Sequence, residues 1–430
     1  MNLVIFIILF VLLIAGLKFK LSNDILSPYN LLMFFWFAPF MFSFLTLSKY
    51  QTGLSFEAIT IISVSTVILF SVVIIFQKSL ADYGDSEKVD ISILNRQLTP
   101  VVVLLFYSMC LIALYFAEFK GREFPLVSFI LGSEQNSSLH RYGKDSKLQF
   151  LAAGISVAGA YCFSVFLCHR KKIVRILFFL LAFSVPLFGL LKASKSDIFI
   201  PFIYYSSIFY YLRGWKIKKF AIKFFIIFIV VALFLATVTE IRVRGVGYAK
   251  PVTYSDLIKY KNIAFLPLPV NNLISIVYGY ACLNFQNFSN YVDVDDGRLR
   301  LGTSFFRPFY SIIMHGDIAN ELLVPKSKWN FVSRSATVGT FLRDLYMEGG
   351  AILCLIGSFI YSILVCLIYF KFKTKKNLVW LLIYANFMFP WIWLFFQNAF
   401  SVLTFYLNAF YIILIPIIVD VFTIKRARLS

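Results

Sequence analysis

The stretch Ala351–Lys376 reads AILCLIGSFIYSILVCLIYFKFKTKK, in which twenty uncharged and mostly apolar residues precede four lysines within six positions. A helix needs roughly 20 apolar residues to cross the hydrocarbon core of a bilayer. Basic residues that flank such helices gather on the cytoplasmic side of the membrane. The stretch therefore predicts a membrane-spanning helix whose end near Lys376 lies in the cytoplasm.

The whole chain shares this apolar character. Of its 430 residues, 60% are hydrophobic, 19% are aromatic and only 14% are charged, whereas about 25% are charged in an ordinary globular domain. Such a chain cannot cover a water-facing surface, so lipid must be its solvent. The net charge of +20 would suggest nucleic acid in a soluble protein. Here the basic residues cluster between apolar runs, and we expect no nucleic-acid partner.

Apolar runs of spanning length recur, and we expect an all-α polytopic membrane protein with about eleven transmembrane helices. The first run lacks the basic start and small-residue cleavage site of a signal peptide, so we expect it to be a membrane helix. The expected spans are 2–17, 28–48, 58–77, 99–118, 149–168, 173–191, 197–212, 220–239, 350–370, 377–396 and 401–421.

Four basic blocks set the expected orientation. They are 169–175, 213–223, Lys371–Lys376 and 425–428. The positive-inside rule assigns all four to the cytoplasm. Alternating the spans satisfies the four blocks together, which predicts an N-terminus outside and a C-terminus in the cytoplasm.

This alternation divides the chain into three parts. We expect spans one to eight with short loops in 1–239, a large periplasmic loop in 240–349, and spans nine to eleven with a basic cytoplasmic tail in 350–430.

One stretch of the large loop, Asn262–Leu283, is apolar enough to suggest a further span. A further span would move the Lys371–Lys376 block to the wrong side, and Pro267 and Pro269 interrupt the stretch near its start. We therefore expect an interfacial or re-entrant helix in this loop.

The six cysteines form no CxxC pair and no cluster with histidine. This pattern argues against structural disulfides and zinc sites. We expect no metal and no cofactor.

The expected outer loops carry more cations than the positive-inside rule predicts. The arginine fork is suited to phosphate or carboxylate, which indicates an anionic ligand. The alternatives are lipid headgroups and salt bridges to nearby aspartates. The candidate diphosphate- or substrate-binding residues are Lys192, Lys195, Arg242, Arg244, Lys250, Arg334 and Arg343.

Three residues of the expected outer loop are candidate catalytic groups. Histidine side chains ordinarily change charge near neutral pH, so His315 is a candidate general base, together with Asp317 and Glu348. Asp344 and Glu348 lie four residues apart and share a face of an expected helix. They are either a base with its orienting group or charge partners of Arg343.

The segment Thr340–Gly350, TFLRDLYMEGG, resembles the oligosaccharide repeat unit polymerases, the Wzy-type O-antigen and capsule polymerases of bacteria. The Lys192–Ser196 turn, KASKS, is similar to the Gly-Ser-Arg-Ser turn of that family, and Arg242 and Arg244 match its basic cluster. The chain departs from the pattern in having lysines in the turn and Glu348 where aspartate is usual.

The resemblance implies a GT-C-like glycosyltransferase in the bacterial inner membrane that needs no metal. It implies transfer of a glycan from undecaprenyl diphosphate to a lipid-linked acceptor repeat unit at the periplasmic face. A chain-length regulator and a flippase are the protein partners that it implies. Lys192, Lys195, Arg242 and Arg244 would then stabilise the diphosphate leaving group.

Three other functions remain open. An O-antigen ligase is disfavoured because Gly339 stands where ligases carry a histidine. A lipid-linked oligosaccharide flippase or another transporter is disfavoured because ionisable residues are nearly absent from the span centres. A non-enzymatic assembly subunit would tolerate the loss of any single outer arginine.

Overall fold

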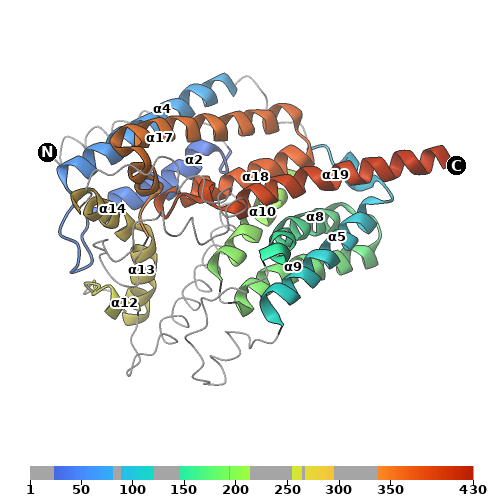
Figure 1. Ribbon diagram of the computed structural model, residues 1–430, viewed down its shortest axis with the longest axis horizontal. Helices are drawn as coiled ribbons and strands as arrows, with labels where there is room; N and C mark the ends of the chain where they lie inside the picture. The colour runs from blue at the N-terminus through green and yellow to red at the C-terminus, as the bar shows by residue number, and fades with distance from the viewer. Residues whose placement is uncertain are drawn as a thin grey trace. The chain divides into compact units, whose positions relative to one another are not determined.

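The chain is mainly helical in the part that the structure describes. The structure is a computed structural model and describes residues 24–80, 89–120, 146–192, 194–213, 254–263, 267–294 and 338–429. Within these ranges every named element is a helix, and two isolated β-bridges join Ser48 to Tyr260 and Asp90 to Asn377. The prediction of an all-α chain is confirmed for these residues (Figure 1).

Seven helices in the described ranges are long and apolar enough to cross a membrane. Each falls on a predicted span: Phe56–Lys78, Thr99–Glu118, Leu148–Cys168, Lys172–Leu191, Phe341–Lys375, Leu378–Phe395 and Leu403–Thr423. The chain is thus a multi-pass membrane protein, and the total of eleven spans stays a prediction.

The predicted span 28–48 is an unbroken helix from Pro28 to Ser43, shorter than a full crossing. It consists of α2 (Pro28–Leu32), a π-helical turn η1 (Met33–Phe37) and α3 (Ala38–Ser43). Pro39 has no N–H to donate, and the backbone beside it loosens so that Ala38 N–H bonds to the Met33 carbonyl.

The predicted span 197–212 corresponds to α10 (Lys195–Arg213), which is helical but is not among the seven apolar helices. Its tyrosines, serines and terminal charges lower its hydropathy. The predicted spans 2–17 and 220–239 lie outside the described residues.

The chain forms two compact units, which we describe separately. Unit 1 comprises Met1–Ser86, Ser255–Thr374 and Phe387–Val402, and unit 2 comprises Glu87–Tyr254, Lys375–Asn386 and Leu403–Ser430. The helix α18 (Leu378–Ile392) contributes its first part to unit 2 and its last part to unit 1.

Unit 1 has an aromatic core. The Trp36 ring lies 5.2 Å from both Phe285 and Phe341, and all three side chains are buried. The Trp36 indole N–H donates to the hydroxyl of Thr66 (2.9 Å) on α4 (Phe56–Leu80), which satisfies the one polar atom of the indole. The core therefore joins the helix 28–43 to α4 and to the α17 hairpin described next.

Helix α17 (Phe341–Lys375) is two helices joined by a reversal at Gly349 and Gly350. In a straight helix, residues twelve apart would be separated by about 18 Å. Here the Cys354 thiol donates to the Leu342 carbonyl (3.3 Å), so the short helix 341–348 folds back on the long one. We call 341–375 the α17 hairpin (Figure 1).

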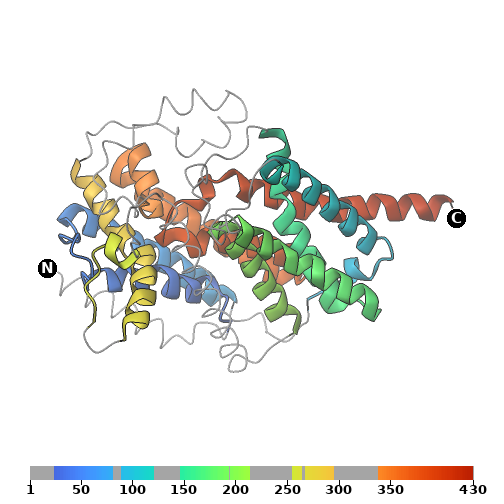
Figure 2. The ribbon, with the colours of Figure 1, turned by 90° about the horizontal axis from the view of Figure 1, so that it is seen from below.

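Part of the predicted outer loop is also helical. The helices α12 (Tyr254–Leu257), α13 (Leu268–Ala281) and α14 (Leu283–Val294) lie in it, the last two in yellow in Figures 1 and 2. Helix α13 begins directly after Pro267 and, with 14 residues, is too short to span a bilayer. Its interfacial or re-entrant placement stays a prediction.

In unit 2, α8 (Ile155–Cys168), α9 (Lys172–Leu191) and α10 pack side by side, as both ribbon views show (Figures 1 and 2). Helices α5 (Thr99–Leu114), α7 (Ser146–Ala153) and α19 (Leu403–Leu429) complete the unit. The Tyr161 hydroxyl donates to the Ile412 carbonyl (2.8 Å), and that of Tyr204 donates to Asn386 (2.9 Å). Buried tyrosines thus tie α19 and α18 to this bundle.

Candidate functional site

Only some of the predicted site residues lie in the described ranges. Lys192 and Lys195 belong to unit 2, and Arg343 and Glu348 belong to unit 1. Lys195 is the first residue of α10, and its side chain lies outside the described part. The other predicted site residues lie outside the described residues: Arg242, Arg244, Lys250, His315, Asp317 and Arg334.

The first candidate site is the start of the α17 hairpin. The Asn287 side chain on α14 donates to the Val338 carbonyl (2.8 Å), which fixes the segment before the short helix. A Cβ atom on Gly339 would lie 2.8 Å from Arg343 Cδ, so the absence of a side chain there lets the Arg343 stem pack against the backbone. A histidine at position 339 would displace Arg343.

Arg343 forms an ion pair with Asp344. The Arg343 NH2 nitrogen lies 2.9 Å from Asp344 Oδ1, and the two side chains are only 12% and 17% exposed. Asp344 is therefore a charge partner of Arg343, which was one of the two roles predicted for it. Because both side chains are largely shielded from water, the loss of either one would leave the other as an uncompensated charge and destabilise the fold.

Glu348 ends the short helix and is 2% exposed. The next two residues are the glycines of the reversal, so the carboxylate is fixed by a turn that only glycine allows at Gly350. An ionised carboxylate is rarely buried in an apolar chain without a functional or pairing role. Of the three predicted catalytic residues, Glu348 is the one that lies in the described part of the chain.

A buried hydroxyl lies beside Arg343. Thr340 is fully buried, and its Oγ1 has no hydrogen-bond partner in the described part of the chain. This oxygen is one of ten buried side-chain atoms without a hydrogen-bond partner in the described part, whereas native proteins satisfy nearly all such groups. The sequence did not single out this hydroxyl, although Thr340 opens the motif.

Sequence reasoning also missed Glu57. The Tyr346 hydroxyl on the short helix donates to Glu57 Oε1 (2.8 Å) at the start of α4. Position 57 lies almost 300 residues before its partner, so no sequence spacing signals the contact.

The second candidate site is the turn between α9 and α10 in unit 2. The Lys192 ammonium contacts the carboxylates of Glu118 and Asp197. Glu118 comes from a π-helical turn, η3 (Tyr115–Phe119), which ends α5 and is closed by Lys120 N–H donating to the Tyr115 carbonyl (2.9 Å). We call Glu118, Lys192 and Asp197 the lysine cluster.

Gly189 makes the lysine cluster sterically feasible. A Cβ atom at this position would lie 2.8 Å from the Asp197 carbonyl carbon and 2.9 Å from the Ile198 nitrogen. The backbone of α10 therefore approaches α9 as closely as its atoms permit. This contact brings Asp197, in the first turn of α10, next to Lys192 at the end of α9.

The environment of Lys192 keeps its side chain charged. Burial acts to lower the pKa of this ammonium, but Asp197 and Glu118 outweigh that effect and raise the pKa above its ordinary value. The sequence predicted that Lys192 binds a diphosphate or another anion, with salt bridges as the alternative; in the structure its side chain is 14% exposed and has two anionic partners. Neither carboxylate was predicted, although each ends or begins a predicted span.

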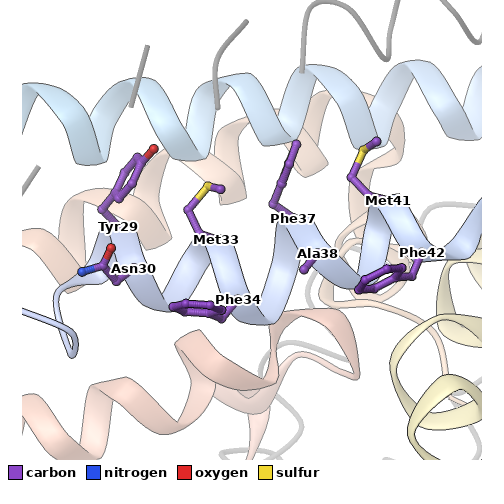
Figure 3. Close-up of a pocket in the computed structure, with 8 residues that line it drawn as sticks. All are labelled: Tyr29, Asn30, Met33, Phe34, Phe37, Ala38, Met41 and Phe42. Carbon is purple, nitrogen blue, oxygen red and sulfur yellow. The ribbon is translucent and has the colours of Figure 1, made fainter. Parts of the chain in front are cut away.

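A third feature is an apolar groove of about 430 Å³ on the helix 28–43. Figure 3 shows its lining as two rows of side chains along that helix. Tyr29 and Phe37 in one row pack against Phe70 of α4, whereas Phe34 and Phe42 in the other row are mostly exposed. Exposed phenylalanines suit a surface that faces lipid.

The described residues form neither a disulfide nor a metal-binding cluster. All six cysteines are free thiols. Among the described residues, no group of three or more His, Cys, Asp or Glu side chains is arranged to hold a metal ion.

Comparisons with protein families, with curated proteins and with solved structures find no match for this chain.

Proposed function

We propose that this protein polymerises lipid-diphosphate-linked oligosaccharide repeat units at the outer face of a bacterial inner membrane. The observation that carries the proposal is the α17 hairpin. The segment that resembles the polymerase family folds into it, with the Arg343–Asp344 pair and Glu348 held in an apolar environment. Charged groups in such a place are expensive to bury, which favours a role in binding or chemistry.

The chemistry needs two kinds of group, and the hairpin offers both. The acceptor hydroxyl oxygen forms a bond to the anomeric carbon of the donor glycan, and the bond from that carbon to the diphosphate oxygen breaks. The diphosphate leaves with the electron pair, and a cation such as Arg343 stabilises its charge. The acceptor proton passes to a carboxylate, for which Glu348 is the described candidate.

The Thr340 hydroxyl supports substrate binding at this place. A sugar or phosphate oxygen would satisfy a buried group that has no other partner among the described residues.

Contacts within each unit support the proposed alternation of the spans. In unit 1, Lys373 Nζ lies 2.9 Å from Asp24 Oδ2, and alternation of the spans places both residues on the cytoplasmic side. In unit 2, Asp90 pairs with Asn377, and alternation places these two inside as well. Both contacts fit the alternation, and the positive-inside rule then assigns their shared side to the cytoplasm and the Gly349–Gly350 reversal to the outer side.

The test uses Thr340→Val in a strain that lacks the chromosomal gene. Valine keeps the shape of threonine and removes only the unpaired hydroxyl. We expect wild-type protein to restore a ladder of long surface glycans, and the variant to give mainly single-repeat glycans at equal protein level. The variant should unfold at the wild-type temperature or above it, because a buried unsatisfied group has been removed.

Thr66→Val is the matched control, because its hydroxyl accepts from the Trp36 indole. This variant should lower the unfolding temperature. If Thr340→Val gave a full ladder of long glycans, the Thr340 hydroxyl would not take part in substrate binding.

If the deletion strain itself left long lipid-linked chains unattached, the protein would be a ligase. Repeat units that accumulated on the cytoplasmic face of the deletion strain would indicate a flippase. Normal polymer from every site variant would indicate an assembly subunit.

A further inference from the structure

The lysine cluster differs from an anion-binding site in its charge. One ammonium faces two carboxylates, so the cluster carries a net negative charge when all three groups are ionised. A diphosphate that approached Lys192 would come close to Glu118 and Asp197 as well. Repulsion from these carboxylates would oppose the attraction of the ammonium.

The three members come from separate elements. Glu118 lies on the π turn that ends α5, Lys192 caps the end of α9, and Asp197 lies in the first turn of α10. The ammonium is also well placed at the carboxyl end of α9, and the Asp197 carboxylate at the amino end of α10. The cluster therefore ties three helix ends together at the turn.

Two backbone contacts brace the same turn. Lys192 N–H donates to the Phe188 carbonyl (3.0 Å), and Ser194 N–H donates to the Gly189 carbonyl (2.9 Å). Ser194 and Asp197 also have the spacing of a capping box at the start of α10. These contacts fix the backbone at which Lys195 begins its helix.

We propose that Lys192 is a positioning residue, held by Glu118 and Asp197, and that it fixes the turn from which Lys195 acts on the diphosphate. This inference rests on the proposed polymerase function. It reassigns Lys192 from ligand binding to structure and adds Glu118 and Asp197 to the residues on which the reaction depends.

Charge removal tests the assignment. Lys192→Met leaves two carboxylates without their cation, and the loss is destabilising mainly at Glu118, whose side chain is 16% exposed, because Asp197 is partly solvated. We expect the unfolding temperature of the full-length protein in detergent to fall by about 5 °C or more. In the deletion strain, protein level and polymer should fall together.

The decisive variant is the triple substitution Lys192→Met, Glu118→Gln and Asp197→Asn. Neutral side chains of similar shape remove the unpaired charges, so the unfolding temperature should return to within about 2 °C of wild type. The restored turn should return most of the long glycans. Lys195→Met is the comparison, and it should keep its unfolding temperature yet lose the long glycans.

Two results would overturn the inference. A triple variant as unstable as Lys192→Met would mean that the cluster does not hold the turn. A triple variant that is stable but makes only single repeats would mean that the reaction needs the Lys192 charge itself. Failure of the polymerase proposal would give a different result, because strains with the wild-type gene and with an empty vector would then make the same glycans. The unfolding temperatures of the variants would still test whether the lysine cluster holds the turn.

Discussion

The α17 hairpin of unit 1 and the α9–α10 hairpin of unit 2 both reverse the chain beside buried charges, but their glycines serve different purposes. Gly350 is needed for its backbone angles, since φ is +65° and ψ is −158° and a Cβ atom there would meet nothing within 4 Å. Gly189 is needed for space, since its Cβ atom would strike the backbone of α10. One glycine therefore relieves strain within its own residue, and the other permits an approach between two helices.

The charged side chains at the two turns also differ, in whether they pair within one helix or between several. In the α17 hairpin, Arg343 and Asp344 are adjacent in sequence and pair within one helix, which leaves Glu348 at the tip. In unit 2, the lysine cluster draws its members from three helix ends. The first arrangement suits chemistry at a fixed carboxylate, and the second suits bracing.

The largest effect is expected from Gly189→Ala. The added methyl group would push the Asp197 backbone away and weaken the lysine cluster, at a cost of about 3 kcal/mol of folding free energy. Thermal unfolding of the purified protein in detergent measures this effect. Gly357→Ala is the comparison, because the atoms nearest to its Cβ atom would be side-chain atoms of Leu345 and not backbone atoms. Equal losses from the two variants would refute the close-approach argument.

A smaller effect is expected from Gly350→Ala, because strain replaces the steric clash. Forcing alanine into a backbone region that is essentially restricted to glycine costs about 2 kcal/mol. The same unfolding measurement applies, and glycan length in the deletion strain should shorten because Glu348 lies next to the reversal. A variant with wild-type stability would show that the hairpin does not depend on this angle.

The smallest effects come from two tyrosine hydroxyls. In unit 2, Tyr204→Phe leaves the buried Asn386 without its donor, which should cost about 1–2 kcal/mol. In unit 1, Tyr346→Phe frees an exposed Glu57 that water can solvate, so a loss below about 1 kcal/mol is expected. Chemical denaturation of both variants gives the comparison, and a larger loss from Tyr346→Phe would reverse it.

The parts of the fold that were predictable depend on local hydropathy. Uncharged runs such as 351–370 predict membrane helices, because a backbone in lipid must form its hydrogen bonds internally and a helix does so. The reversal at Gly350 was not predictable, because the same letters TFLRDLYMEGG also fit a straight helix leading into that span. The shortened helix 28–43 was missed for a related reason, since hydropathy does not report where a helix ends.

The candidate sites were less accessible to sequence reasoning. Lys192 was singled out because of its charge at a predicted outer turn, but its partner Glu118 lies more than 70 residues earlier. Hydropathy and spacing place each residue along its own helix, and only packing shows which helix ends meet. Glu348 was named from the sequence, but its burial, which supports the proposed role, is not revealed there.

The most direct test of the proposed function compares Glu348→Gln, Glu348→Asp and Glu57→Gln in the deletion strain, measuring the ratio of multi-repeat to single-repeat glycans at equal protein level. The account predicts that Glu348→Gln lowers this ratio by about a hundredfold, the scale typical of losing a general base. Glu348→Asp should recover part of it, and Glu57→Gln should match wild type. A wild-type ratio from Glu348→Gln would contradict the account.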